Sequence, residues 1–108
     1  MAYGFDTLQI HAGAAPDPAT GARQTPIYQT TAYVFRDADH AAALFNLQEV
    51  GFIYSRLTNP TVAVLAERIA TLEGGQGAVC CSSGHAAQIM ALFPLMAPGR
   101  NVVASSRL

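Results

Sequence analysis

The chain of 108 residues has a net charge of −1, a charged fraction of 12% and a hydrophobic fraction of 51%. The charged fraction is about half the ~25% of an average soluble domain, and with so many apolar residues this excludes a disordered chain. The near-neutral charge balance excludes a basic nucleic-acid-binding surface, and no apolar run approaches the ~18 residues that a membrane-spanning helix needs.

The first 36 residues predict an irregular segment. Residues 1–10 lack the basic and apolar regions of a signal peptide, so a cytoplasmic location is expected. Residues 12–24 show no periodicity and predict a long loop, whereas residues 25–35 are rich in β-branched and aromatic side chains and predict extended backbone. Asp37 is a suitable N-cap for a short helix, whose apolar stripe would consist of Ala41, Leu44, Phe45 and Leu47.

A longer helix is predicted directly after Asn59, a good N-cap that is followed by Pro60 at the first helical position. Gly74 and Gly75 suit the left-handed backbone that commonly ends a helix. We therefore expect residues 1–58 to form an extended arm and residues 59–108 to begin a large domain. The apolar face of the helix recurs at spacings of three and four residues, at Val62, Leu65, Ile69 and Leu72.

The remaining residues predict a strand–helix–strand unit. Residues 78–81 and 101–105 are short apolar runs bounded by turn residues, which favours two buried strands. A helix from His85 to about residue 93 or 96 would connect them, and Pro94 is expected to kink or end it. This order predicts a right-handed parallel βαβ unit. Because such a unit alone leaves edges and faces uncovered, we expect the sequence to be the N-terminal part of a larger α/β protein.

Ser83, Gly84 and His85 form the turn between the first predicted strand and its helix. The first N–H groups of a helix lack partners within the helix and, together with the helix dipole, favour a bound phosphate. Gly84 would let an anion approach the backbone closely. The alternative is that Ser83 only caps the helix and Gly84 only makes the turn. The glycine-rich residues 74–77 follow a helix instead of a strand, so they indicate a helix cap and not a phosphate loop.

Tyr54, Ser55 and Arg56 form a second candidate site. In an extended segment the side chains of Tyr54 and Arg56 point the same way. An arginine binds a phosphate through two N–H groups, and a tyrosine hydroxyl can add a third donor. The alternative is an ordinary surface arginine beside a packed tyrosine.

Few other residues are candidates for a metal-binding or catalytic role. The three histidines, His11, His40 and His85, are far apart in sequence, and the adjacent Cys80 and Cys81 lack the spacing of metal ligands, so no metal site is predicted. The two cysteines are expected to be free thiols that behave as small buried apolar residues. The sequence contains no lysine. A mechanism that requires a lysine, such as Schiff-base chemistry, therefore needs residues outside this chain.

Several strings carry a family resemblance. They are FDTLQIHAG at residues 5–13, DPATGAR at 17–23, PIYQTT at 26–31, YSRLTNPT at 54–61, and SGHAA at 83–87. Over essentially its whole length, the chain resembles the N-terminal quarter of the Cys/Met-metabolism pyridoxal-phosphate (PLP) enzymes. The Tyr-x-Arg-x-x-Asn-Pro-Thr pattern is specific for the family. The Asp-Pro-x-Thr-Gly-Ala-Arg and Gln-Thr-Thr patterns are most similar to the O-acetylhomoserine sulfhydrylase branch.

The resemblance implies an α/β protein of fold type I, the aspartate-aminotransferase-like architecture, with an arm that reaches a neighbouring subunit. It implies that Tyr54 and Arg56, with Ser55 between them, bind the PLP phosphate of the neighbouring protomer. Gly84 and His85 would donate backbone N–H groups to the phosphate of their own protomer. His85 stands where the family often has Met or Gln, a change that a main-chain contact tolerates. The family's catalytic groups, including the Schiff-base lysine, lie further along the chain, so no catalytic residue is expected here.

The implied activity of the parent enzyme is a γ-replacement, in which O-acetyl-L-homoserine and sulfide give L-homocysteine and acetate. The implied partners are these two substrates and further copies of the chain, in a homotetramer with shared active sites, with neither nucleic acid nor membrane. A cystathionine γ-synthase or a methionine γ-lyase is an alternative within the family. A non-catalytic anion-binding or interaction fragment is an alternative of another class, and the missing lysine fits it.

Overall fold

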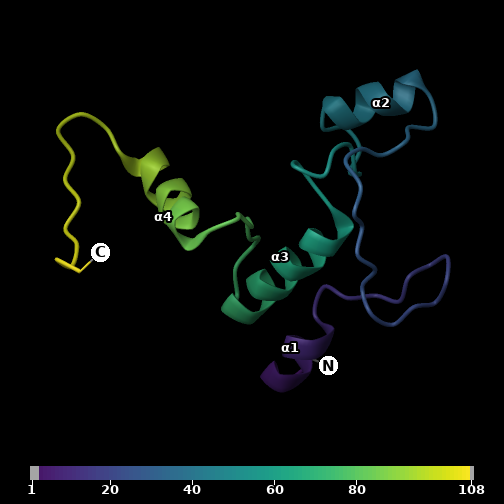
Figure 1. The fold of residues 1–108 in the computed structure, drawn as a ribbon, viewed down its shortest axis with the longest axis horizontal. Helices are drawn as coiled ribbons and strands as arrows, with labels where there is room; N and C mark the ends of the chain where they lie inside the picture. Colours follow the sequence, from purple (N-terminus) through teal and green to yellow (C-terminus); the bar gives the residue numbers. More distant parts are fainter. Residues whose placement is uncertain (1–2, 108) are drawn as a thin grey trace.

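The computed structural model describes residues 3–107, in which helices are joined by long irregular segments (Figure 1). The helices of this part are α1 (Phe5–His11), α2 (Ala38–Phe45), α3 (Pro60–Glu73) and α4 (Gly84–Leu92), followed by the 3-10 helix η1 (Phe93–Leu95). Figure 1 shows α1 beside α3, with α2 and α4 apart from this pair. The radius of gyration is 17.8 Å, well above the ~13 Å of a compact domain of this length. The arrangement is therefore open.

α3 confirms the longer predicted helix at both ends. The Asn59 side chain accepts a hydrogen bond from the Thr61 N–H, and Pro60 occupies the first helical position. At the other end Gly74 has a φ of 67°, in the left-handed region where glycine is favoured. The Gly75 N–H donates to the Ala70 carbonyl at 2.8 Å. Local sequence therefore determines where this helix begins and ends.

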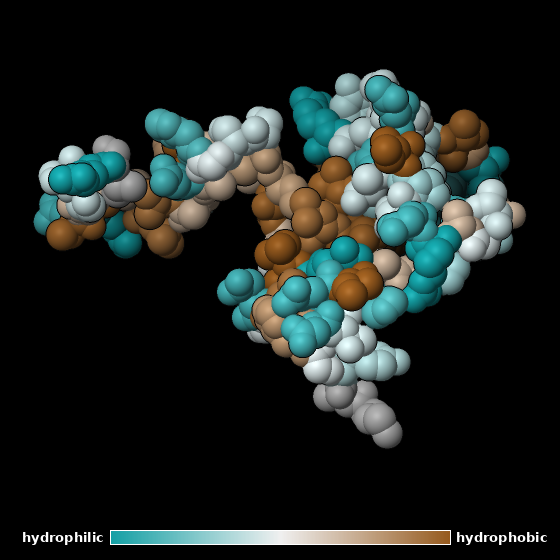
Figure 2. Space-filling view, turned by 60° about the horizontal axis from the view of Figure 1, so that its bottom comes forward, coloured by the Kyte–Doolittle hydropathy of each residue, from teal (hydrophilic) through white to brown (hydrophobic). Residues whose placement is uncertain are grey.

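The predicted apolar face of α3 is not buried in this chain. Val62, Leu65 and Ile69 keep 45%, 52% and 45% of their surface exposed. Figure 2 shows apolar side chains gathered on one face of the molecule, with nothing covering them. The buried residue of α3 is instead Ala70, with 8% exposure. The helix therefore has an apolar surface that this chain alone leaves in contact with water.

α1 is a helix that the sequence analysis did not anticipate. Its N-cap, Gly4, has no side chain to cap it, and its seven residues are too few for a stable isolated helix. Contact with α3 supports it: the Arg68 Nε donates to the carbonyl of Ala12, the residue after α1, at 2.9 Å. The next residue, Gly13, has a φ of 69° and passes so close to α3 that a Cβ would lie 2.8 Å from the Val64 carbonyl oxygen. Tertiary packing, and not local propensity, explains α1.

α2 confirms the short predicted helix, although its apolar stripe is only partly buried. The Asp37 carboxylate caps it by accepting from the His40 N–H at 2.7 Å. Leu44 is the residue of the stripe that forms a core, with 3% exposure. Leu47 lies beyond the end of α2 with a φ of 57° and 90% exposure, so its predicted place in the stripe is wrong. The helix ends before the position at which Leu47 would face inward.

The predicted long loop over residues 12–24 is irregular, and Asp17 orders its tip. One carboxylate oxygen of Asp17 accepts from the Thr20 N–H and the Thr20 hydroxyl, each at 2.8 Å. The other accepts from the Tyr28 hydroxyl at 3.2 Å. The hydrogen bonds from Thr20, followed by those from Tyr28 and Ala19, hold the pKa of Asp17 below its ordinary value of 3.8. The ionised carboxylate therefore favours the folded form of this loop.

The two predicted strands form no ladder within residues 3–107. Residues 78–81 lead from α3 to α4, and residues 101–105 lie beyond α4, so the two segments are not side by side (Figure 1). The only bridge in the described part of the chain is antiparallel, between Ala32 and Tyr54. The expectation that residues 78–81 and 101–105 pair in a βαβ unit here is therefore wrong. A strand needs a hydrogen-bonding neighbour about 4.8 Å away, and neither segment has one.

The cysteines share the exposure of the first of these segments. Cys80 and Cys81 are free thiols, as expected, but both are exposed, so their predicted burial is wrong. The reason is that no second layer covers residues 78–81 within the described part of the chain. A separate finding concerns membranes: among residues 3–107, no helix is both long and apolar enough to cross one.

Candidate functional site

Residues 54–56 are fixed by backbone hydrogen bonds to residues 25–35, hereafter the arm. The Ser55 N–H donates to the Thr31 carbonyl at 2.9 Å, beside the bridge between Ala32 and Tyr54. The Tyr54 carbonyl then accepts from the Thr58 N–H at 3.0 Å, which turns the chain toward α3. Residues 25–35 are not helical and contribute Ala32 to the bridge, and they hold this segment in place.

The Arg56 side chain lies over the Tyr54 ring. The guanidinium carbon is 5.3 Å from the ring centroid, a cation–π distance. Among the described residues, Arg56 makes no salt bridge with a carboxylate. The two side chains therefore lie together, but on a turn at residues 55–57, so the predicted extended backbone is wrong at this point. The guanidinium keeps its donors available for an anion.

Ser55 differs from its two neighbours because its donors are already used. Its hydroxyl donates to the Thr30 carbonyl, and its oxygen accepts from the Asn59 Nδ2 at 3.0 Å. Its N–H, as described above, is bonded to Thr31. The Ser55 side chain is therefore bonded to other parts of this chain, whereas the side chains of Tyr54 and Arg56 face outward.

The start of α4 leaves two backbone donors open. The Ser83 hydroxyl caps the helix by accepting from the Ala86 N–H at 3.1 Å, which confirms its capping role. The N–H groups of Gly84 and His85 have no acceptor among the described residues. A Cβ built on Gly84 meets no atom within 4 Å, so the space beside it is open. Two free N–H groups at a helix N-terminus suit an anion.

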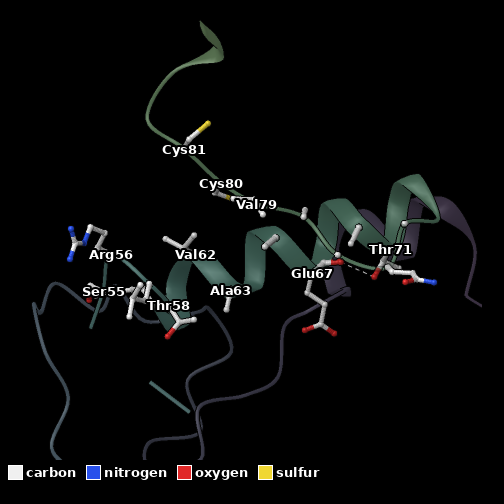
Figure 3. A pocket seen from close by; sticks show the side chains of 18 of the residues that line it. Ser55, Arg56, Thr58, Val62, Ala63, Glu67, Thr71, Val79, Cys80 and Cys81 are labelled. Atoms are coloured by element: carbon white, nitrogen blue, oxygen red, sulfur yellow. Dashed lines mark hydrogen bonds between the residues drawn. The ribbon is translucent and has the colours of Figure 1, made fainter. Parts of the chain in front are cut away.

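A cavity of about 960 Å³ runs along α3 and brings part of the candidate site together (Figure 3). Ser55 and Arg56 line it at the start of α3, and residues 75–82 line it from the other side. Tyr54, Gly84 and His85 are not among its lining residues. Within this single chain, Arg56 and Ser82 therefore share one cavity, and the open N–H groups of α4 begin two residues further on.

The donor set suits a phosphate group better than a metal ion. A guanidinium, a phenol and two backbone N–H groups are hydrogen-bond donors of the kind that phosphate oxygens accept. Arg56 and Glu67 are the charged residues of the cavity wall; Arg56 precedes α3, whereas Glu67 lies on the helix (Figure 3). In residues 3–107, no three His, Cys, Asp or Glu side chains gather in a way that could hold a metal ion.

Asn59 has more contacts than the helix cap that local sequence predicts. In the structure Asn59 is buried, with 8% exposure, and its amide also reaches the arm and Ser55. Asn59 belongs to the Asn-Pro-Thr string. Its hydrogen bonds to Tyr33 and Tyr28, which lie 26 and 31 positions earlier, have no signature in local sequence.

Comparisons with known proteins agree with these features. The profile of the Cys/Met metabolism PLP-dependent enzymes matches residues 6–108. O-acetyl-L-homoserine sulfhydrylase 1 of Thermus thermophilus is 56% identical over 104 residues, which is 96% of this chain and 25% of that protein. Homocysteine synthase of Schizosaccharomyces pombe is also 56% identical over 104 residues, covering 96% of this chain and 24% of that protein.

A solved structure has the same fold. The crystal structure of an O-acetylhomoserine (thiol)-lyase from Campylobacter jejuni, which contains an N′-pyridoxyl-lysine-5′-monophosphate, superposes with a TM-score of 0.80 at 47% identity. The match covers 85% of this chain and 22% of that chain. The predicted fold class, the N-terminal part of a fold type I PLP enzyme, is confirmed. The chain spans about a quarter of the length of the curated relatives it matches.

Proposed function

The chain belongs to the Cys/Met metabolism PLP-dependent enzymes, and from this premise we propose that it forms the N-terminal quarter of an O-acetyl-L-homoserine sulfhydrylase. The parent enzyme converts O-acetyl-L-homoserine and sulfide to L-homocysteine and acetate. The observation that carries the proposal is 56% identity, over 96% of the chain, to a sulfhydrylase of that name.

In the parent enzyme, this chain contributes residues that bind the phosphate of the cofactor. Arg56 and Tyr54 bind the phosphate of a neighbouring protomer, and Gly84 and His85 bind that of their own protomer through backbone N–H groups. Support comes from the Arg56 guanidinium, which lacks a salt bridge in residues 3–107, and from the open space at Gly84. Because its donors are occupied, Ser55 supports the segment from within the fold and does not donate its hydroxyl to the phosphate.

The catalytic groups lie outside the 108 residues. PLP, when bound, supplies an electron-accepting ring, which is the chemistry that replacement at the γ-carbon of the substrate requires. The chain contains no lysine, so the amine that holds this cofactor belongs to another part of the parent enzyme. The proposed binding of a neighbour's phosphate by Tyr54 and Arg56 would make the active sites shared between protomers of a homo-oligomer, in which residues 1–108 provide phosphate binding and subunit contact.

The test is product analysis on the full-length protein that carries these residues, reconstituted with PLP. Homocysteine and acetate formed from O-acetyl-L-homoserine and sulfide are the expected products. Cystathionine formed preferentially from cysteine would identify a γ-synthase, and thiol release from methionine would identify a γ-lyase. A protein that binds phosphate but neither binds PLP nor turns over any of these substrates would be the non-catalytic module.

A further inference from the structure

Asn59 lies where three segments meet and is among the few buried residues of the chain, with 8% exposure. Its Oδ1 accepts from the Thr61 N–H at 2.9 Å, which is the helix cap. Its Nδ2 reaches the Tyr28 carbonyl at 2.9 Å and the Ser55 hydroxyl oxygen at 3.0 Å. One amide therefore joins the start of α3, the extended arm and the segment that carries Arg56.

The donors and acceptors around this amide fix its orientation. An amide turned the other way would place Oδ1 against the Tyr28 carbonyl, so two acceptors would meet. Ser55 gives its own proton to the Thr30 carbonyl, so its oxygen must accept from Asn59. The Tyr33 hydroxyl, 3.4 Å from the Ser55 oxygen and 3.2 Å from Asn59 Nδ2, completes the network. The network is fully satisfied, with no unpaired buried side-chain polar atom in residues 3–107.

Thr61 strengthens the same connection two residues further on. Its hydroxyl donates to the Pro26 carbonyl at 2.8 Å and accepts from the Tyr28 N–H at 2.9 Å. The arm is thus tied to α3 at two points, and the arm in turn holds residues 54–56 through the bridge at Ala32. The position of Arg56 relative to α3 follows from these hydrogen bonds, since no hydrogen bond or salt bridge joins its own side chain to α3 in residues 3–107.

We infer that Asn59 is a positioning residue for the proposed phosphate-binding site. Its Nδ2 group, acting through Ser55 and the arm, sets the placement of Tyr54 and Arg56. Asn59 itself makes no hydrogen bond to either of those side chains and is not proposed as a ligand of the phosphate. The inference rests on the proposed function. It separates two roles of one side chain, since the cap uses Oδ1 and the positioning uses Nδ2.

Two substitutions divide these roles. Asn59→Ser keeps a good N-cap for α3 but removes both Nδ2 donors. Asn59→Asp keeps an acceptor for the Thr61 N–H and also removes the donors. Asp37→Ala is the matched control, because it removes the N-cap of α2, a side chain that accepts only from the His40 N–H and makes no hydrogen bond to residues 54–56.

The measurement is the dissociation constant of PLP from the full-length protein, titrated by fluorescence into the apo form, together with the thermal midpoint of each variant. Asn59→Ser and Asn59→Asp should each weaken PLP binding about five- to twentyfold, the size expected for losing well-placed hydrogen bonds. Asp37→Ala should lower the thermal midpoint, because it removes a helix cap, and leave the PLP constant within about twofold of wild type. Equal losses of PLP affinity in Asp37→Ala and Asn59→Ser would overturn the inference, since they would reflect general destabilisation.

A double-mutant cycle with Arg56→Ala decides whether Asn59 affects PLP binding through Arg56. If it does, adding Asn59→Ser to Arg56→Ala should cost less than about twofold further PLP affinity. Effects that multiply would overturn the inference and leave the proposed function intact. If Arg56→Ala alone does not weaken PLP binding, the proposed phosphate site itself fails. The two failures are thus told apart by a single-variant measurement.

Discussion

Two residues of the candidate site, Gly84 and Arg56, are not required by the packing of this chain. Gly84 opens α4, yet the folded chain places no atom within 4 Å of a Cβ built there. Arg56 likewise has no carboxylate partner among residues 3–107. Neither residue is needed to complete the packing of this chain, so the requirement for both is expected to come from the phosphate.

Replacing Gly84 tests this distinction. Gly84→Val should weaken PLP binding by the full-length protein, because the side chain occupies the space through which the phosphate reaches the N–H groups of α4. Gly84→Ala, with a smaller side chain, should weaken it less. The thermal midpoint of the apo protein should change little in both. A large loss of apo stability without any change in PLP affinity would assign Gly84 to the fold alone.

At the scale of elements, the arm is held to α3 by polar side chains more than by apolar burial. Asp17 orders the loop before the arm, and Thr61 and Asn59 fasten the arm to the start of α3. Polar ties of this kind depend on protonation and on the presence of each partner. The loop and the arm should therefore respond to pH and to single substitutions in ways that an apolar core would not.

Asp17 gives the pH dependence a definite direction. The pKa of its carboxyl is lowered in the folded chain, chiefly by the hydrogen bonds from Thr20. The stabilisation is therefore complete above the unfolded-state value of 3.8 and is lost as pH falls through the lower folded-state value. In the full-length protein, Asp17→Asn should lower the thermal midpoint at neutral pH. The difference from wild type should shrink as pH falls below about 4.

The control for this experiment is Asp39→Asn, because the Asp39 side chain makes no hydrogen bond or salt bridge among the described residues. Its difference from wild type should not follow the same acidic transition. A difference for Asp17→Asn that stays constant from neutral pH to pH 3 would contradict the role assigned to the carboxylate.

The whole molecule has too little core for its length. Leu44 and Ala70 are its buried hydrophobic residues in the described part of the chain, and the radius of gyration is 17.8 Å. Large apolar side chains on α3 and α4 remain exposed, as the brown surface in Figure 2 illustrates. Domains are normally stabilised by burial of such surfaces between layers. The relatives, of which this chain spans about a quarter, have three further quarters of chain to cover them.

The chain on its own should therefore lack a cooperative fold. Expressed as residues 1–108, it should aggregate or bind a hydrophobic dye without a sharp thermal transition. Joined to the remaining three quarters of the Thermus relative in place of the matched residues, it should become cooperatively folded and bind PLP. A monomeric 108-residue chain with dispersed amide signals and a cooperative transition would show that the buried residues suffice.

Sharing of the active site between protomers is tested by mixing two inactive full-length variants, Arg56→Ala and one that lacks the PLP-binding lysine. Arg56→Ala should weaken PLP binding about ten- to a hundredfold, because a charge-assisted contact contributes ~1.5–3 kcal/mol. After unfolding and reassembly in equal amounts, about half of all dimers are mixed. If Arg56 serves its neighbour, one site of each mixed dimer is intact, and roughly a quarter of wild-type activity should return. If Arg56 serves its own protomer, no activity should return even though mass measurement confirms mixed dimers.

Local sequence by itself determined where the helices with strong capping residues begin and end. It also determined the family to which the chain belongs. Asn59 and Pro60 begin α3 and Gly74 ends it, while Asp37 begins α2 and Ser83 begins α4. These signals can be read from sequence because a cap bonds to backbone only two or three residues away. The motifs that carry the family resemblance are likewise short strings in a fixed order, and the family profile confirms them.

Tertiary structure alone decided the features that depend on distant residues. α1 forms because it packs on α3, and residues 78–81 stay unpaired and leave Cys80 exposed because no neighbouring strand lies beside them. The same holds for Asn59, whose second role depends on Tyr28, 31 residues earlier. Periodicity and propensity describe what a segment favours, but pairing and burial require a partner, and the three-dimensional fold determines which partner is present.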